Sequence, residues 1–222
     1  MALWDKITSR GKVDDRRSMA PVKVGGLGLG GIAIYLIANY LLGGQIDIFE
    51  VLRQVEQVQI EQPQNINNQN FEGQDSYEVF ASTVLGSNND LWQSIFEKNN
   101  QTYQPPTLVL FRTATQSSCG TATSQIGPHY CPIDKTIYLD ETFFDELTNL
   151  LGAKGGDVAE AYVIAHEIGH HIQNELGIMD QVNQDNTDNN LSINLELQAD
   201  CFAGLWANSI KDEGVFLPGE IN

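Results

Sequence analysis

Residues 157–177 read DVAEAYVIAHEIGHHIQNELG, and this stretch decides which kind of domain the chain forms. Its apolar residues recur every three or four positions, which predicts a helix that packs one face against a core. Asp157 is a suitable N-cap, Glu160 completes a capping box with it, and Gly177 can end the helix. The stretch therefore predicts one amphipathic helix.

Residues 166–170 of this helix read HEIGH. Residues four positions apart project from the same helix face, so the imidazoles of His166 and His170 can converge on one Zn²⁺ ion. Glu167 is rotated out of that pair, yet it stays near enough to take a proton from metal-bound water. Burying these groups without a partner would be costly, and a metal ion is such a partner. We therefore predict two zinc ligands and, in Glu167, a general base.

A second helical pattern, at residues 192–210, contains two carboxylates four positions apart, Glu196 and Asp200. Like charges at this spacing repel each other, which indicates a nearby cation or histidine. A catalytic zinc needs a third protein ligand and one open position. We assign Glu196 to the metal and Asp200 to the orientation of a ligand histidine. The spacing alone also permits the reverse assignment, or two carboxylates on a solvated face.

The composition is that of a globular chain with a strongly acidic body. The 222 residues are 41% apolar and carry a net charge of −17, yet residues 1–23 contain six basic and three acidic side chains. Residues 24–44 hold no charge, so the acidity lies after them. A body this acidic repels phosphate backbones, which argues against a nucleic-acid partner.

One uncharged segment, residues 24–42, reads VGGLGLGGIAIYLIANYLL. Its length matches a helix that crosses a bilayer once, and the basic side chains lie before it. We therefore expect a single-pass membrane protein with a cytoplasmic N-terminus and its catalytic domain outside, periplasmic or extracellular. A cleaved signal peptide, a twin-arginine export signal at Arg16-Arg17 and a buried core helix are the alternatives.

The charge distribution, the uncharged segment and the two helical patterns divide the chain into four predicted regions. They are a basic cytoplasmic tail at 1–23, a transmembrane helix at 24–42, an amphipathic helix with an Asn/Gln-rich linker at 43–75, and a zinc metallopeptidase domain at 76–222. Within the domain, residues 77–85 and 90–98 read as two short helices, and residues 107–113 and 136–140 read as strands. If the first strand lies at a sheet edge, it can accept an extended peptide.

The three cysteines have different surroundings. Cys119 and Cys131 lie in a loop-rich region between the two strands, and we predict a disulfide between them, which indicates an oxidising compartment. Two reduced thiols or two metal ligands are the alternatives. Cys201 lies in the second helical pattern and reads as a small packed residue.

Three more polar residues lie near the motif or in a loop. His171 points about 100° away from His170, so we expect it behind the ligands or at the surface. His129 and Tyr130, in the loop GPHYCP, are candidates to donate to a developing oxyanion if that loop overhangs the site. Either of them can equally be an ordinary loop residue.

Several strings of the sequence resemble one bacterial family, the "putative neutral zinc metallopeptidases". These strings are VDDRR, GGLGLGGIAIYLI, VFASTVLG, SSCG, GPHYCP, IYLD, AYVIAHEIGHHIQN and LELQADCFAG. The resemblance implies an outward-facing zinc peptidase of the gluzincin type, with His166 and His170 as ligands and Glu167 as base. The string ELQAD is also similar to the E-x-x-x-D helix of C-a-a-X-type membrane proteases, which favours Glu196 over Asp200 as the third ligand. Members of the family continue past this helix, so we expect the metallopeptidase domain to be C-terminally incomplete here.

The expected protein is an α+β, gluzincin-like metallopeptidase domain with an HExxH helix, a second ligand-bearing helix and a small sheet. It would hydrolyse peptide bonds in a peptide or protein with a Zn²⁺-activated water, Glu167 acting as general base. A catalytically inactive, zinc-stabilised envelope scaffold or protein-binding module is the rival interpretation, and hydrolysis of a non-peptide amide is a third. A scaffold would tolerate Glu167→Gln, whereas a peptidase would keep its metal and lose turnover.

Overall fold

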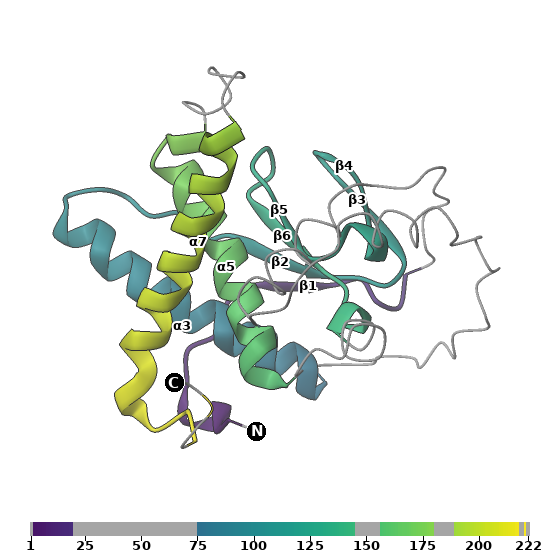
Figure 1. Ribbon diagram of the computed structural model, residues 1–222. Coiled ribbons are helices and arrows are strands. Elements are labelled where there is room, and N and C mark those ends of the chain that lie inside the picture. Colours follow the sequence, from purple (N-terminus) through teal and green to yellow (C-terminus); the bar gives the residue numbers. More distant parts are fainter. Residues whose placement is uncertain (1, 20–74, 145–155, 180–188, 218–219, 221–222) are drawn as a thin grey trace, which may run out of the picture.

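The computed structural model describes residues 2–19, 75–144, 156–179, 189–217 and 220. Three long helices run through this part of the chain: α3 (Ser76–Lys98), α5 (Asp157–Glu175) and α7 (Asn189–Ile210) (Figure 1). The larger sheet has the strand order β1 (Val13–Asp15), β2 (Thr107–Leu110), β6 (Thr136–Leu139) and β5 (His129–Cys131). A hairpin of β3 (Ala114–Ser117) and β4 (Gly120–Thr123) forms the smaller sheet. Single 3₁₀ turns are η1 (Trp4–Lys6), η2 (Ser124–Ile126) and η3 (Lys211–Glu213).

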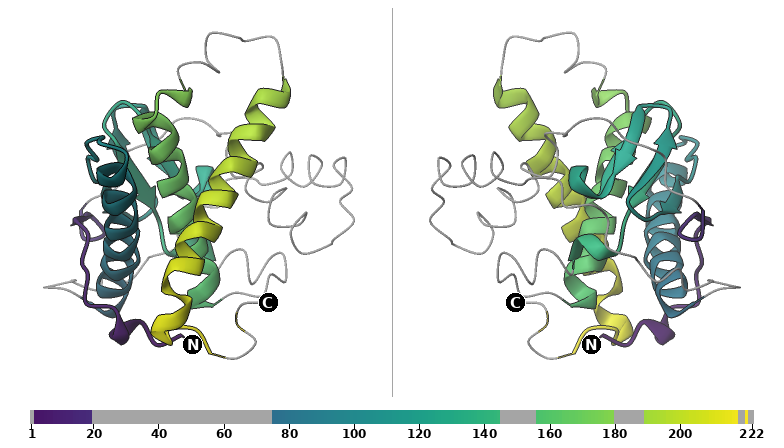
Figure 2. Two further views of the ribbon diagram at one scale, coloured as in Figure 1. Left: turned by 90° about the vertical axis from the view of Figure 1, so that its left-hand side faces the viewer. Right: turned by 90° about the vertical axis from the view of Figure 1, so that its right-hand side faces the viewer.

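The helices share one core with the larger sheet. Both α3 and α5 contact the sheet and each other, while α7 lies along α5 (Figure 2). The buried cluster between them contains Leu85 of α3, Leu108 of β2, Ile168 of α5 and Trp206 of α7. The predicted α+β class is therefore confirmed.

Strand β2 lies inside the sheet, because it pairs in parallel with β1 on one side and with β6 on the other. Strand β5 is antiparallel to β6. The strand predicted over 107–113 ends at Leu110, and Thr113 has a φ of 65°, in the left-handed region. The hypothesis that this strand offers a free edge to a peptide is therefore wrong.

Helix α3 is continuous where the sequence predicted two short helices. Gly86, in its middle, lies against the N-terminal segment, and a Cβ atom there would meet the backbone nitrogen of Arg10 at 2.5 Å. The neighbouring Ser87 accepts a hydrogen bond of 2.9 Å from the indole nitrogen of Trp206. Tertiary packing thus keeps the helix intact over residues that read locally as a break.

Helix α5 confirms the predicted helix, with a difference at its start. Gly156 occupies the N-cap position that the sequence analysis gave to Asp157. The Asp157 carboxylate instead accepts hydrogen bonds from the backbone nitrogen of Ala2, at 2.7 Å, and from the indole nitrogen of Trp4, at 2.9 Å. At the other end Gly177 has a φ of 69°, as its predicted role in ending the helix requires.

Residues 2–17 belong to the folded domain, which corrects the prediction of a separate basic tail and of a domain that starts at residue 76. Val13 to Asp15 pair with Leu108 to Leu110 of β2. Gly11 donates to the carbonyl of Ser82 at 2.7 Å and accepts from its hydroxyl at 2.8 Å. The segment therefore adds a strand to the sheet and packs along α3.

The predicted transmembrane helix at 24–42 and the linker region up to residue 74 lie outside the described residues. In the part of the chain that the structure describes, no helix combines the length and the apolar character that a bilayer crossing requires.

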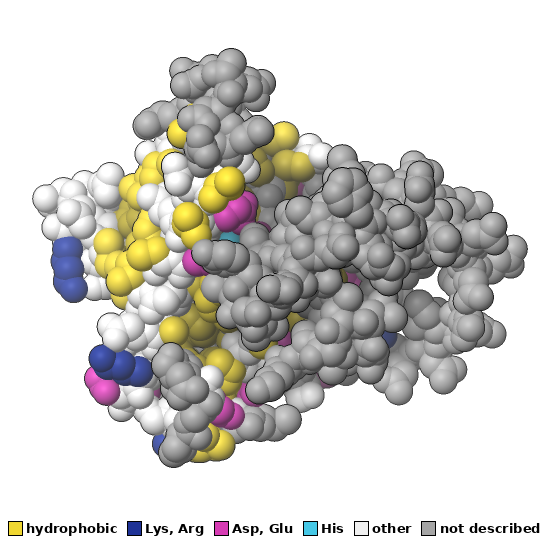
Figure 3. All heavy atoms as spheres, in the orientation of Figure 1, with side chains coloured by type: hydrophobic (Ala, Val, Ile, Leu, Met, Phe, Trp, Pro, Cys, Tyr) yellow, Lys and Arg dark blue, Asp and Glu magenta, His cyan; other side chains and the backbone are white. Residues whose placement is uncertain are grey.

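The predicted disulfide is confirmed: Cys119 and Cys131 are bonded, with their Cα atoms 5.8 Å apart. It ties the turn of the β3–β4 hairpin to β5. Cys201 is exposed, contrary to the expectation of a packed thiol. It lies on α7, whose outer face also exposes Leu197 and Leu205; Figure 3 shows hydrophobic side chains gathered over this helix.

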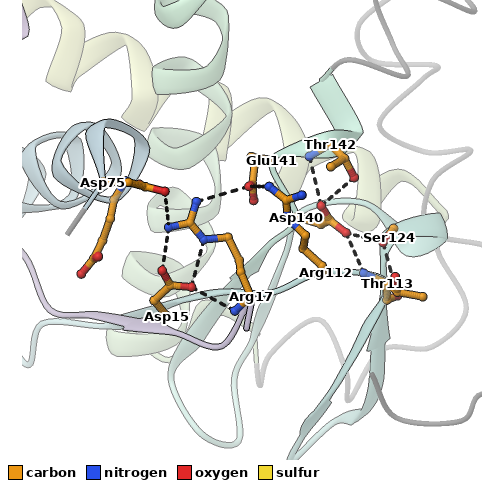
Figure 4. Close-up of polar contacts among 10 residues, drawn as sticks. Asp15, Arg17, Asp75, Arg112, Thr113, Ser124, Asp140, Glu141 and Thr142 are labelled. Carbon is orange, nitrogen blue, oxygen red and sulfur yellow. Dashed lines mark hydrogen bonds and ion pairs between the residues drawn. The ribbon is translucent and has the colours of Figure 1, made fainter. Parts of the chain in front are cut away.

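A buried ion-pair network around Arg17 joins the N-terminal segment to the start of α3 and to the residues after β6 (Figure 4). The Arg17 side chain is only 1% exposed and lies 2.6 Å from Asp15, 3.0 Å from Asp75 and 3.3 Å from Glu141. Glu141 also pairs with Arg112. Burial works against ionisation of Asp15, but its hydrogen bonds and ion pair with Arg17 outweigh that effect and lower its pKa.

The carboxylate of Asp140 shapes the turn next to this network (Figure 4). One oxygen accepts a hydrogen bond from the backbone nitrogen of Thr113 at 2.9 Å and another from the Ser124 hydroxyl. The other oxygen accepts from the backbone nitrogen of Thr142 at 3.0 Å and from its hydroxyl at 2.7 Å. These bonds hold the left-handed conformation of Thr113, in the turn between β2 and β3.

We predict that Arg17→Met lowers the free energy of unfolding of the metal-free protein by about 3–5 kcal/mol, because three carboxylates lose a buried partner. Lys12→Met removes the same charge from an exposed position and should change it by no more than about 0.5 kcal/mol. Urea unfolding of both variants measures this difference. Equal, small changes would contradict the packing of residues 2–17 in the domain.

Candidate metal centre

Helices α5 and α7 approach each other closely where the predicted site lies. A Cβ atom on Gly169 would meet Ala199 at 2.8 Å from its Cα and 2.9 Å from its carbonyl oxygen. Gly169 directly precedes His170, and Ala199 directly precedes Asp200. The missing side chain at Gly169 therefore lets the helix with the histidines reach the helix with the carboxylates.

The donor atoms of His166, His170 and Glu196 converge across this contact. Nε2 of His166 lies 3.2 Å from Oε2 of Glu196, and Nε2 of His170 lies 3.5 Å from the same oxygen. All three donor atoms lie within 4.8 Å of one another. Two imidazoles and one carboxylate are a ligand set of catalytic zinc sites, so the residues fit the ion that the sequence analysis predicted.

The centre is partly open to solvent. The Glu196 side chain is 37% exposed, whereas those of His166 and His170 are 10% and 14% exposed. Figure 3 shows histidine surface next to acidic side chains beside the α7 face. Water can therefore reach the convergence point, as a fourth, open position requires.

Asp200 contacts Nδ1 of His166, and Tyr162 contacts Asp200. Nδ1 of His166 lies 2.8 Å from Oδ1 of Asp200, and the Tyr162 hydroxyl donates to the same oxygen at 2.5 Å. A carboxylate only accepts, so Nδ1 carries a proton, and Nε2, which faces Glu196, is the nitrogen left to bind a metal ion. This contact matches the role predicted for Asp200. Sequence reasoning missed Tyr162, although it precedes His166 by one helical turn on the same face.

Charges around the centre favour a cation. Burial lowers the pKa of His166, but hydrogen bonds to Asp200 and Glu196 outweigh it and raise that pKa to about 10. Burial also lowers the pKa of His170, which rises overall because of its hydrogen bond to Glu196 and the charge of Glu167. Desolvation raises the pKa of Glu196, yet its bonds to both histidines bring it down to about 2. A metal ion that binds here must displace protons from the imidazoles, so its affinity falls as the pH is lowered.

Glu167 lies on α5 beside the converging donors without being one of them. Its side chain is buried, and the residue is 4% exposed. Its negative charge raises the pKa of both His166 and His170, and the residue directly follows His166 on the same helix. A base next to the metal but outside the ligand set was predicted here.

His171 and Tyr130, two of the remaining candidates, contact each other and other parts of the domain. Nε2 of His171 donates to the carbonyl of Gln104 at 2.8 Å, so Nδ1 accepts from the Tyr130 hydroxyl at 3.0 Å. Asn174 donates to the same hydroxyl at 2.9 Å. Burial lowers the pKa of His171 to about 4, which keeps it neutral. These residues join α5 to β5, and the proposed oxyanion role of Tyr130 is not supported.

His129 also lies apart from the three converging side chains. Its ring stacks on Tyr138 with the ring centroids 5.4 Å apart, and its Nδ1 lies 3.0 Å from the carbonyl oxygen of Gly127. The His129 side chain therefore stabilises its own loop and strand pair. Its candidate role as an oxyanion donor has no support in this geometry.

We predict that Gly169→Ala lowers the free energy of unfolding by about 1–3 kcal/mol, because the added methyl overlaps the Ala199 backbone. Zinc affinity should fall with it, since α7 must move away from α5. Gly204→Ala is the matched control: nothing lies within 4 Å of its added Cβ, and alanine favours the helix by about 1 kcal/mol. Urea unfolding and chelator competition check both variants. A Gly169→Ala variant as stable as Gly204→Ala would contradict the close crossing.

Comparisons with known proteins point to one family. The profile of one family, described as "Putative neutral zinc metallopeptidase", matches residues 2–222. Over 154 residues the chain is 46% identical to "Uncharacterized protein YpfJ" of Escherichia coli (strain K12), which covers 67% of this chain and 53% of that protein. Over 120 residues it is 44% identical to "Uncharacterized protein Rv2575" of Mycobacterium tuberculosis (strain ATCC 25618 / H37Rv), covering 52% and 41%.

The chain thus spans about half the length of the curated relatives it matches. No solved structure matches it. The family profile covers the N-terminal strand, the HEIGH helix and the helix of Glu196 in one continuous match. On that match, the chain belongs to the family described as "Putative neutral zinc metallopeptidase".

Proposed function

We propose that this chain forms the catalytic part of a zinc-dependent peptidase. The observation that carries the proposal is the meeting of Nε2 of His166, Nε2 of His170 and Oε2 of Glu196, with the buried Glu167 next to them. The family to which the chain belongs is named for the same metal and reaction. The substrate would be a peptide or a protein.

His166, His170 and Glu196 would hold the Zn²⁺ ion. Bound in this way, zinc lowers the pKa of a coordinated water toward about 7 and polarises a carbonyl group. Asp200 accepts a hydrogen bond from Nδ1 of His166, so Nε2 is the nitrogen that would bind the metal. Tyr162 holds the Asp200 carboxylate in place by donating to the same oxygen.

Glu167 would move the proton. Its carboxylate is shielded from bulk water and lies on the same helix as both imidazoles, one residue after His166, so it would accept a proton from the attacking water. The same oxygen can then deliver that proton to the amine that leaves the scissile bond. Glutamine at this position keeps the shape but can no longer accept a proton.

We predict that wild type and Glu167→Gln each bind about one zinc per chain, while Glu196→Ala loses zinc or binds it much more weakly. Glu167→Gln should lower kcat on a peptide library by a factor of about 10²–10⁴, because only proton transfer is lost. Elemental analysis after dialysis and a cleavage assay test the two parts. Zinc-binding without turnover in either protein would favour the inactive scaffold. Absence of zinc from wild type would exclude the peptidase proposal for this chain.

We further propose that residues 2–19 and the metal centre lie in one compartment. A single bilayer crossing at 24–42 would place β1 and β2 on opposite sides of the membrane, yet these strands pair. Arg17 and Asp75, on either side of residues 20–74, are also in contact at 3.0 Å. The Cys119–Cys131 disulfide supports an oxidising, outward-facing compartment for both parts. This proposal replaces the expected cytoplasmic N-terminus.

We predict that Thr8→Cys and Thr102→Cys, both at exposed positions in a Cys201→Ser background, react alike with a membrane-impermeant maleimide on intact spheroplasts. Equal labelling before and after lysis is the expected result for an outward-facing domain. Labelling of Thr8→Cys only after lysis, with Thr102→Cys labelled from the start, would restore the single-pass arrangement.

A further inference from the structure

Gln173 is completely buried between α5 and α7, at 0% exposure, and the sequence analysis gave it no role. It follows His170 by three residues on α5, so the two side chains share one face of the helix. Its Oε1 lies 2.9 Å from Nδ1 of His170. Gln173 therefore contacts the nitrogen of His170 that points away from the converging donor atoms.

The hydrogen bonds on the other side of Gln173 fix which way its amide points. Its Nε2 donates to the carbonyl of Leu195 at 2.7 Å and to Oε1 of Gln198 at 3.1 Å. Both partners are acceptors, so an NH₂ group must face them. The oxygen of Gln173 then faces His170 and can only accept, which places the proton on Nδ1 of His170.

We propose that Gln173 is a positioning residue of the metal centre, which holds His170 with its Nε2 directed toward the point where the three donor atoms converge. It does for His170 what Asp200 does for His166, with a neutral amide in place of a carboxylate. The inference rests on the proposed zinc binding.

The second part of the role is a link between the two helices. The chain of contacts runs from His170 through Gln173 to the backbone of Leu195, the residue before Glu196. One buried side chain thus fixes a ligand on α5 relative to the backbone that carries a ligand on α7. The neutral amide also adds no negative charge to a centre that already holds Glu167, Glu196 and Asp200.

Zinc affinity measured by chelator competition tests this role. Gln173→Met keeps the length of the side chain and removes the acceptor, and we predict a 10- to 100-fold loss of affinity. Gln198→Met is the matched control: Gln198 contacts the Gln173 amide but not His170, and affinity should change less than about threefold. A Gln173→Met protein that binds zinc as tightly as wild type would overturn the inference.

A second variant separates positioning from packing. Gln173→Glu keeps an oxygen for Nδ1 of His170 but cannot donate to Leu195, so it should retain affinity within about tenfold while the metal-free protein becomes less stable. Equal losses of affinity in Gln173→Met and Gln173→Glu, each in step with stability, would mean a structural role only. If wild type itself binds no zinc, the proposed function fails and not merely the role of Gln173.

Discussion

The close contact between α5 and α7 is the constraint on which the rest of the site depends. Glycine at 169 allows the backbone of Ala199 to lie where a side chain would otherwise be. Several polar contacts of the centre cross this junction: His166 to Asp200, both histidines to Glu196, and Gln173 to Leu195. Because the ligands come from two helices, their distances are set by helix packing. Any change that separates the helices removes the third ligand before it affects the first two.

The sequence predicted the parts of this centre that depend on local spacing. Two histidines four residues apart on one helix, and two carboxylates four apart on another, follow from helical periodicity alone. Gly169 and Gln173 could not be found in that way, because neither has a local signature. A glycine in a helix reads as a weak point until its neighbour is known. A buried glutamine has a role only through the partners that satisfy its amide, and Leu195 and Gln198 lie far along the chain.

The N-terminal segment was misjudged for a related reason. Its arginines read as a solvated basic flank before an apolar segment, since charge counts carry no information about distant partners. Arg17 is in fact buried against Asp75 and Glu141, which lie far from it in sequence. Strand β1 has only three residues, too few for an alternating pattern, and its pairing with β2 is parallel and non-local. The disulfide was easier to predict, because only two of the three cysteines lay in a loop-rich region.

The N-terminal residues also bear directly on the two ligand helices. Ala2 and Trp4 donate to Asp157, in the first turn of α5, and the Trp4 ring stacks on Trp206 of α7 with centroids 6.3 Å apart. Ala2 and Trp4 therefore link the start of α5 to the later part of α7. Gly169 sets how close the helices come at the site, and this second contact limits how far they can rotate about it. A domain defined from residue 76 onward would keep every proposed ligand and lose this N-terminal link between the ligand helices.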